Sequence, residues 1–359
     1  ITLLSQMYSL VSLDANIAPR GTNTPYMILN QTGYDINVWI DSDDKKSRTN
    51  RKTIRQNQTV PWEFEDWTEI REKLDVDTQK NSIVVELIGS PYKAIESISL
   101  IGEGEELFMM TPPIQGVHNR LACSITLTKD NVKQIVLKST LTVHNTSGVG
   151  ILIGIGLASD RGVNEIYPVA AGELFSLPID HVYKEALAVK PDLPNSSYGW
   201  SSSRIRWKSL YDKPSLLECA ANSDKLKGDN VSFYFQVDAE RYSNSTRKIY
   251  PHLKIVISSP LQIENLLPYD MMYRIYDKTI RKFWLVLLKK GSSSSIHFVN
   301  IKNLLLMSVE PLNCGFQKSE FVIIHAPEES GFPTDSRLDL KHDDGQKLHL
   351  NIDYGVSKD

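Results

Sequence analysis

The chain has 359 residues, with 40 Lys and Arg against 43 Asp and Glu, a net charge of −3 and 41% apolar residues. This balance argues against a protein built chiefly to bind nucleic acid or to coat an anionic membrane, and the apolar content argues against disorder. The longest uncharged apolar stretches, such as 151–158, are far shorter than the roughly 20 residues of a membrane-spanning helix, so a soluble chain without a transmembrane segment is expected. The sequence begins at Ile1 without a signal peptide, and we expect it to be a piece of a longer protein.

One segment recurs three times along the chain. Residues 25–30 (PYMILN) align without gaps with 140–145 (TLTVHN) and 260–265 (PLQIEN), which places Asn30, Asn145 and Asn265 at intervals of 115 and 120 residues. Each Asn is followed three residues later by Gly or Pro and then by apolar residues at every second position. That pattern is typical of a strand with one buried face. A turn signal recurs 26 or 27 residues after each Asn, at Asn57, Gly172 and Gly291.

Further elements are predicted between these signals. One short helix is expected from the capping residue Asp66 to Leu74. Cationic pairs bracket 283–288, which indicates a buried strand with charged residues at its ends. Asp343-Asp344-Gly345 indicates a hairpin turn between two short strands. Gly199-Trp200 and Gly315-Phe316 look like one recurring pair in the second and third copies. Strands are also predicted at 82–88, 121–128, 231–237, 304–309, 321–325 and 348–354.

These elements predict an all-β protein. Repeats of about 115–120 residues are much longer than solenoid units, so each is expected to form a small domain with its own core. Short strands separated by Gly, Pro, Asn and Ser turns favour three tandem β-sandwich-like repeats. We place repeat 1, divergent and carrying the helix, at 1–130, repeat 2 at 131–249 and repeat 3 at 250–359.

The recurrent Asn has two interpretations. Strands are depleted in Asn because its amide competes with the backbone ladder, so something local must favour it. It either fastens a loop inside each repeat or presents an edge to an incoming peptide. Recurrence at equal register favours the structural role, since a fold needs such a fastening in every repeat and a ligand rarely does. Asn30, Asn145 and Asn265 are the predicted sites, with peptide binding as a secondary role.

The sequence shows no catalytic constellation, and we expect no enzymatic activity, no cofactor and no metal. The three Cys are too few and too scattered for a disulfide framework or a zinc site, which fits a reducing compartment. His342-Asp343-Asp344 resembles a metal corner but is better explained by the hairpin turn.

A basic run lies in repeat 1. It is expected to form a solvated loop between two strands, with contact to an anionic partner as the functional alternative. It lacks the aromatic residues of a nucleic-acid platform, and no nucleic acid is expected. Its cations are Lys45, Lys46, Arg48, Arg51, Lys52 and Arg55.

Residues 258–270 (SSPLQIENLLPYD) with 273–277 (YRIYD) resemble the adaptor-binding region of the vacuolar-protein-sorting-thirteen family of bridge-like lipid transfer proteins. The segments at 30–33, 145–148 and 198–201 resemble earlier repeats of the same region. The resemblance covers essentially the whole chain, and the three Asn match the family's recurrent Asn. It implies an arched array of six all-β repeats, of which this chain holds three, most like the first three.

The resemblance also implies a function. The family docks Pro-X-Pro segments of organelle adaptors and so targets lipid transport to membrane contact sites of the endosome, vacuole and mitochondrion. The chain would be peripheral on the cytosolic face, with adaptors and the remaining repeats of its parent chain as partners. Because the family's peptide site is attributed to the last repeats, this chain is expected to be the N-terminal supporting part.

An alternative comes from the glycosylation sequons. Asn-X-Ser/Thr triplets include those that begin at Asn30, Asn57, Asn145, Asn195 and Asn244. In a secreted protein they would accept glycans, which would favour an extracellular adhesion or glycan-binding β-sandwich array.

Overall fold

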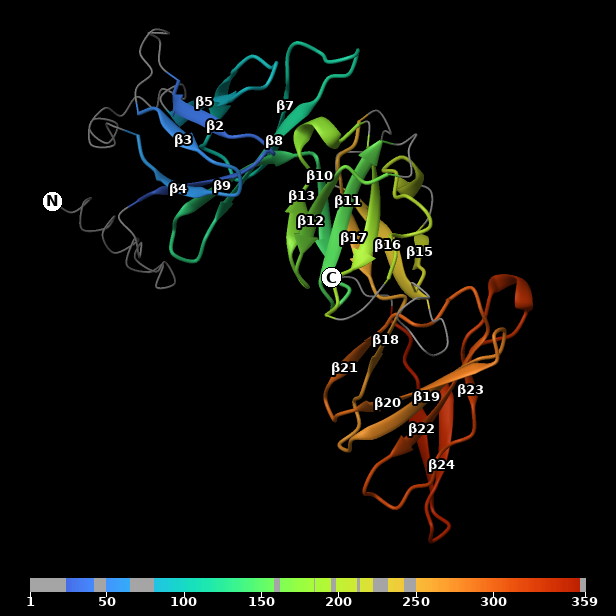
Figure 1. The fold of residues 1–359 in the computed structure, drawn as a ribbon. Helices are drawn as coiled ribbons and strands as arrows, with labels where there is room; N and C mark the ends of the chain where they lie inside the picture. Colours follow the sequence, from blue (N-terminus) through green and yellow to red (C-terminus); the bar gives the residue numbers. More distant parts are fainter. Residues whose placement is uncertain are drawn as a thin grey trace, which may run out of the picture.

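The chain folds into three successive β units (Figure 1). A computed structural model describes residues 24–41, 50–64, 81–157, 162–183, 185–194, 198–211, 214–221, 232–241 and 250–355. We name the units by the sheets they contain: unit 1 is 24–139, unit 2 is 140–258 and unit 3 is 260–355. The expected all-β, sandwich-like repeats are confirmed, whereas the helix expected at 66–74 lies outside the described residues.

The strands follow one another in the same order in each unit. Unit 1 has β1 (Tyr26–Gln31), β2 (Ile36–Ile40), β3 (Lys52–Ile54), β4 (Thr59–Trp62), β5 (Ser82–Leu87), β6 (Ile95–Ser99), β7 (Gly104–Met109), β8 (Arg120–Leu127) and β9 (Lys133–Ser139). Unit 2 has β10 (Leu141–Asn145), β11 (Ile151–Leu157), β12 (Glu165–Val169), β13 (Leu174–Ser176), the 3-10 turn η2 (Ile179–His181), β14 (Glu185–Pro191), η3 (Ser209–Tyr211), β15 (Ser215–Cys219), β16 (Phe233–Arg241) and β17 (Leu253–Ser258). Unit 3 has β18 (Leu261–Glu264), β19 (Met271–Asp277), β20 (Lys282–Leu288), β21 (Ser293–Ile296), β22 (Leu305–Pro311), β23 (Val322–His325), η4 (Glu328–Ser330), β24 (Arg337–Lys341) and β25 (Lys347–Asn351).

Units 1 and 2 are two-sheet sandwiches. In unit 1 the sheet β4-β1-β9-β8-β7 faces β3-β2-β5-β6, and in unit 2 β13-β10-β17-β16-β15 faces β12-β11-β14. The alternating apolar residues after each Asn point into these cores: Ile36, Ile151 and Tyr273 are all fully buried. The period-two pattern therefore predicted the inward faces of β2, β11 and β19 correctly.

The strand that immediately precedes each new Asn strand belongs to the preceding unit. β9, which immediately precedes the Asn strand β10, lies in the sheet of unit 1, parallel to β1. β17 likewise precedes β18 and lies in the sheet of unit 2, parallel to β10. Sheet membership thus changes between Ser139 and Thr140 and between Ser258 and Ser259.

The sheet that contains the Asn strand is split in unit 3. β18 pairs with β21 and β24 pairs with β25, as two separate two-stranded pieces. By strand order, β24 and β25 correspond to β7 and β8, so the position of β9 and β17 between β18 and β25 is not filled by any described residue. Ile263, the counterpart of the fully buried Ile28 and Val143, is accordingly only half-buried.

One detail of the predicted pattern is corrected and another is confirmed. Ser201 and Ser319 are equivalent, because each donates its N–H to the carbonyl of a valine near the end of a strand (Val189 of β14 or Val309 of β22) and accepts that valine's N–H at its hydroxyl. The Gly-aromatic pairs are therefore not equivalent: Trp200 corresponds to Lys318. The hairpin predicted at 343–345 is correct, since it joins β24 to β25 with Gly345 at φ +89°.

Candidate functional site

Each recurrent Asn closes a corner between its own strand and the turn that follows 26 or 27 residues later. The Asn N–H donates to the carbonyl just after the turn residue, and the Asn carbonyl accepts from the turn residue's N–H. The turn residues have positive φ, of 59°, 80° and 67° for Asn57, Gly172 and Gly291. The distances from their nitrogens to the Asn carbonyl are 2.7 Å to Asn30, 2.7 Å to Asn145 and 2.9 Å to Asn265.

The side-chain amides form equivalent hydrogen bonds in all three corners. In each corner Nδ2 donates to the carbonyl four residues later and to the carbonyl that ends the second strand after the Asn strand (β3, β12 or β20), while Oδ1 accepts the N–H two residues later. The four-residue contacts are 2.7 Å to Tyr34, 2.8 Å to Val149 and 2.9 Å to Tyr269. The strand-end contacts are 3.0 Å to Ile54, 3.0 Å to Val169 and 3.2 Å to Leu288. Oδ1 accepts from Thr32, Ser147 and Leu267 at 3.0–3.2 Å.

These amides face inward. Asn30 and Asn145 are fully buried, and Asn265 is 1% exposed. An amide has two N–H donors and one carbonyl acceptor, and in each corner both kinds of group bond to atoms of the same unit. The arrangement joins three backbone segments, and it directs no amide hydrogen to the surface.

The loops after Asn30 and Asn145 also contact the next unit. In unit 1 the N–H of Ile179 donates to the Thr32 carbonyl at 3.0 Å, and Ile179 is buried in the core of unit 1. Gly33 has φ +91°, and a Cβ on it would lie 2.6 Å from the Cβ of Pro178. Pro178 and Ile179 of unit 2 are thus seated directly on the Asn loop of unit 1.

A carboxylate fixes the same joint. Asp180 of η2 accepts hydrogen bonds from the hydroxyls of Tyr34 and Tyr92, both in unit 1. Burial, together with the hydrogen bond to this carboxylate, raises the pKa of Tyr34. Asn119 donates to the Tyr92 hydroxyl, and these groups border a cavity of about 240 Å³. The cluster joins the two units through polar side-chain contacts.

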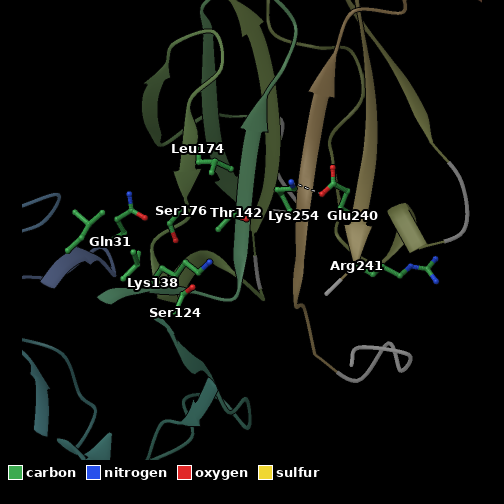
Figure 2. Close-up of a pocket in the computed structure, with 11 residues that line it drawn as sticks. Gln31, Ser124, Lys138, Thr142, Leu174, Ser176, Glu240, Arg241 and Lys254 are labelled. Atoms are coloured by element: carbon green, nitrogen blue, oxygen red, sulfur yellow. Dashed lines mark ion pairs between the residues drawn. The ribbon is translucent and has the colours of Figure 1, made fainter. Parts of the chain in front are cut away.

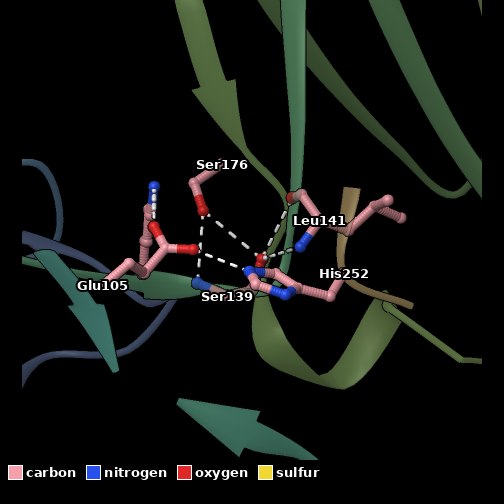
Figure 3. Close-up of polar contacts among 6 residues, drawn as sticks. Glu105, Ser139, Leu141, Ser176 and His252 are labelled. Atoms are coloured by element: carbon pink, nitrogen blue, oxygen red, sulfur yellow. Dashed lines mark hydrogen bonds and ion pairs between the residues drawn. The ribbon is translucent and has the colours of Figure 1, made fainter. Parts of the chain in front are cut away.

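A second polar cluster crosses this joint (Figure 3). Glu105 of β7 pairs with Lys138 of β9 at 2.7 Å and with His252, just before β17, at 2.6 Å. Burial acts to raise the pKa of Glu105, but the hydrogen bonds from His252 and Lys138 outweigh it, and the pKa is lowered. Ser139 and Ser176 bond beside this cluster, where the chain passes from one sheet to the next.

A groove of about 400 Å³ opens next to this cluster (Figure 2). Its walls come from β1, β8 and β9 of unit 1 and from β10, β13, β16 and β17 of unit 2. Lys254 and Glu240 form an ion pair of 2.5 Å within it. The lining residues are Leu29, Gln31, Ser124, Val136, Lys138, Thr142, Leu174, Ser176, Glu240, Arg241 and Lys254.

The joint between units 2 and 3 uses the same loop with different chemistry. His297 of unit 3 occupies the place of Pro178, with Nε2 2.9 Å from the Ser147 carbonyl and Nδ1 2.9 Å from the Tyr234 carbonyl. Its ring stacks on Phe233 at 4.3 Å. Burial lowers the pKa of His297, although the two carbonyls act in the opposite direction. Sequence reasoning missed this residue and Asp180, because neither lies in a recognisable motif.

The predicted basic run is not a free loop over its described members. Arg51 pairs with Glu86 at 3.4 Å and lies 5.9 Å from the Trp39 ring. Lys52 lies in β3 and donates to the Pro61 carbonyl at 2.9 Å, and Arg55 is exposed. Lys45, Lys46 and Arg48 lie outside the described residues.

No cluster of three or more His, Cys, Asp or Glu that could hold a metal occurs among the described residues. Cys123 and Cys219 are buried, and burial raises the pKa of both thiols to about 12. No helix within the described ranges has both the length and the apolar character needed to cross a membrane.

Comparison with known proteins assigns the family. Residues 66–359 match the family model described as vacuolar-sorting associated protein 13, adaptor binding domain. The chain belongs to this adaptor-binding domain family. The match begins within unit 1, after Asn30, and spans all of units 2 and 3.

Two long relatives support the assignment. The chain is 35% identical over 367 residues to an intermembrane lipid transfer protein VPS13 of Chaetomium thermophilum, covering 99% of this chain and 11% of the relative. It is 22% identical over 311 residues to the intermembrane lipid transfer protein Vps13D of Drosophila melanogaster, covering 84% of this chain and 8% of the relative. The chain therefore spans about a tenth of the length of the curated relatives it matches.

Proposed function

We propose that this chain is a non-enzymatic protein-interaction scaffold that helps to target a bridge-like lipid transfer protein to organelle membrane contact sites. The family assignment carries the proposal, since the matched domain is an adaptor-binding domain. The parent protein would act on the cytosolic face of contact sites of the endosome, vacuole and mitochondrion, as a peripheral protein. Its partners there would be adaptor proteins with Pro-X-Pro segments.

Within that role, the three units are proposed to be the supporting N-terminal repeats. The orientation of the three Asn amides supports this, because buried amides that bond within their own unit suit a structural fastening better than a peptide site. The joints support it too, since a loop seated on the next unit gives a stiff arm. We propose unit boundaries at 139/140 and 258/259 in place of the expected 130/131 and 249/250, because β9 and β17 pair with the preceding sheet.

The remaining repeats of the parent chain would complete unit 3. In units 1 and 2 the strand before the next Asn fills the place beside the Asn strand, so we propose that a strand following residue 359 in the parent chain pairs parallel to β18 and antiparallel to β25. The half-buried Leu348 and Leu350 of β25, counterparts of residues buried in β8 and β16, would then be covered.

A strand peptide tests this completion. A peptide with the β17 sequence, residues 253–258, should slow amide exchange in β18 and β25. The same peptide with Ile255→Lys and Ile257→Lys should not. Unchanged exchange in both strands with the parent peptide would contradict the proposed completion.

The basic run contributes to this proposal only in part. Arg51 and Lys52 bond within unit 1, so contact with an anionic partner is proposed only for the exposed Arg55 among the described members. The extracellular alternative is weakened by the sequons: Asn30 and Asn145 are fully buried with their amides bonded, so a folded chain does not present them for glycosylation.

Fluorescence anisotropy tests the proposed role. A labelled Pro-X-Pro peptide is titrated with this chain and, in parallel, with a longer chain that carries the following repeats. We expect saturable binding to the longer chain alone. If this chain binds the peptide and loses that binding when one recurrent Asn is substituted, the supporting role is contradicted. If neither chain binds the peptide, docking of Pro-X-Pro segments is contradicted.

A further inference from the structure

β20 has the sequence of a central strand but the position of an edge strand. All six residues from Phe283 to Leu288 are apolar, which is typical of a strand covered on both faces. In the sheet β20-β19-β22-β23, however, β20 pairs only with β19 (Figure 1). Phe283, Leu285 and Leu287 are 68%, 50% and 55% exposed. The buried strand predicted from the sequence is therefore wrong for one face of β20.

The inner face of β20 is also incompletely covered. Trp284 and Val286 point toward the core of unit 3 but stay half-buried, with Trp284 4.9 Å from the Phe298 ring. An added strand at this edge would therefore find apolar neighbours on both faces of the sheet. Only Leu288, at the Asn265 corner, is buried.

The equivalent strands of the other units are protected edges. Aligned on their turn residues, Leu285 corresponds to Arg51 at the start of β3 and to Ile166 of β12, and Leu287 corresponds to Thr53 and Pro168. β3 has three residues and is flanked by charge, and β12 contains a proline that cannot donate to a further strand. β20 has seven residues, no proline and no polar residue after Lys282.

The open place in unit 3 does not account for this edge. That place lies between β18 and β25, in the other sheet. The joints observed between units lie on the Asn loop, whereas β3 and β12 keep exposed side chains in complete units. A following repeat that docked as units 2 and 3 do would leave β20 uncovered.

Along the sequence, the charge around β20 has one sign, whereas in space Asp277 lies opposite Lys282 and the Asp270 carboxylate accepts the Lys290 N–H. Between Asp277 and Glu310 there are six Lys and Arg and no Asp or Glu. Arg281 precedes β20, and Lys289 and Lys290 follow it, and all three are exposed. Across the seven residues of β20 these two basic ends are separated by about 23 Å.

We propose that β20 is a docking edge for an extended segment of a partner protein, with an apolar centre of about six residues and acidic residues at its ends. The segment would pair its backbone with β20, place alternate side chains beside Phe283, Leu285 and Leu287, and place the others beside Trp284 and Val286. Its acidic ends would face the two basic ends of β20. This surface goes beyond the Pro-X-Pro role and does not depend on it.

Two other occupants fit less well. A second copy of the chain, pairing β20 with β20 in antiparallel register, would bring Arg281 against Lys289 and Lys290, and like charges directly opposite one another destabilise a strand pair. An acyl-chain layer would cover the side chains but would leave the unpaired backbone groups of the edge without partners.

Selection from a random peptide library displayed on phage tests the proposal. The library is panned on this chain, and enriched peptides are measured by fluorescence anisotropy against the parent chain, Leu285→Arg and Ile166→Arg. Ile166 is the matched control, because it occupies the equivalent edge position of unit 2 and is 55% exposed. Both variants should keep the parent melting temperature, since both side chains are exposed.

We expect enriched peptides with an apolar centre and acidic ends, binding at least tenfold more weakly to Leu285→Arg and equally to Ile166→Arg. Their binding should weaken with salt and should slow amide exchange in 283–288. The proposal is overturned if no such pattern is enriched, or if the peptides bind Leu285→Arg as well as the parent. It is also overturned if the β20 amides become protected through self-association or with anionic phosphatidylserine vesicles but not with peptide.

Discussion

Replacement of Asn145 by Ala should destabilise unit 2 strongly. The amide nitrogen of Asn145 contacts the carbonyls of Val149, Val169 and Ala170 at 2.8, 3.0 and 3.0 Å, and Oδ1 accepts the N–H and hydroxyl of Ser147. The variant leaves these groups buried without that partner, at about 1–3 kcal/mol for each group that stays unsatisfied. The Ser147 hydroxyl already reaches the Val149 carbonyl and offsets part of the loss.

We therefore expect a loss of about 2–4 kcal/mol, which corresponds to a decrease of roughly 10 °C in the melting temperature of a unit of this size. Thermal unfolding followed by fluorescence gives the midpoint, and hydrogen exchange localises the effect to the strands β10, β11 and β12. Asn164→Ala is the control, because Asn164 is an exposed residue of the same unit. If Asn145→Ala melts within error of Asn164→Ala, the corner does not fasten the unit, and the structural interpretation of the recurrent Asn is refuted.

Three further outcomes follow from the joints and thiols. Gly33→Ala should weaken the joint between units 1 and 2 more than Gly89→Ala does. Both glycines have positive φ, but only the new Cβ at Gly33 would lie 2.6 Å from the Cβ of Pro178. Limited proteolysis at the joint compares the two variants. The pKa of His297 is lowered in the folded chain, so its contribution to stability is present above the unfolded pKa of about 6.5 and is lost as pH falls below that value. The stability of the joint between units 2 and 3, measured by hydrogen exchange, should therefore decline from pH 7 to pH 5. The decline should be smaller in His297→Gln. A thiol reagent should label Cys314 fast at pH 7 and the other two cysteines only on unfolding, and Cys314→Ser should remove the fast phase seen by absorbance.

Local pattern was enough to predict the corners. The three Asn, the turns 26 or 27 residues later and the alternating residues after them all depend on contacts within one unit, and the period-two pattern reports the buried face directly. That pattern gave the inward residues of β2, β11 and β19. It also gave the hairpin of β24 and β25, whose turn residues carry their own backbone preference.

The sequence pattern could not predict which strands pair with β9 and β17. Both strands lie next in sequence to the Asn strand of the following unit, and their alternation is the same whichever sheet they join. What decides the partner is packing between β1 and β8, or between β10 and β16, which are distant in sequence. The polar joints were missed for a related reason: Asp180 and His297 acquire their roles only when two units meet.

In β20 the sequence and the observed position disagree: the composition is typical of a buried strand, but the strand lies at the edge of its sheet. Six consecutive apolar residues imply cover on both faces, and within the described residues that cover is missing on one face and along one edge. Sequences normally agree with their fold at every level, and conflicts concentrate at sites of function. This conflict therefore indicates that the edge of β20 is a candidate functional surface, independently of any family resemblance.

The connection between consecutive units has a consequence for how the array responds to force or mutation. β9 completes the sheet of unit 1 and β10 begins the sheet of unit 2, and only Thr140 lies between these two strands. The Asn loop of unit 1 simultaneously holds Ile179 of unit 2 in its core. Unit 1 is thus coupled to unit 2 by a one-residue connection between their sheets and by a buried contact. A joint of this kind resists reorientation of one unit against the next, which is the property that the supporting arm proposed above would require.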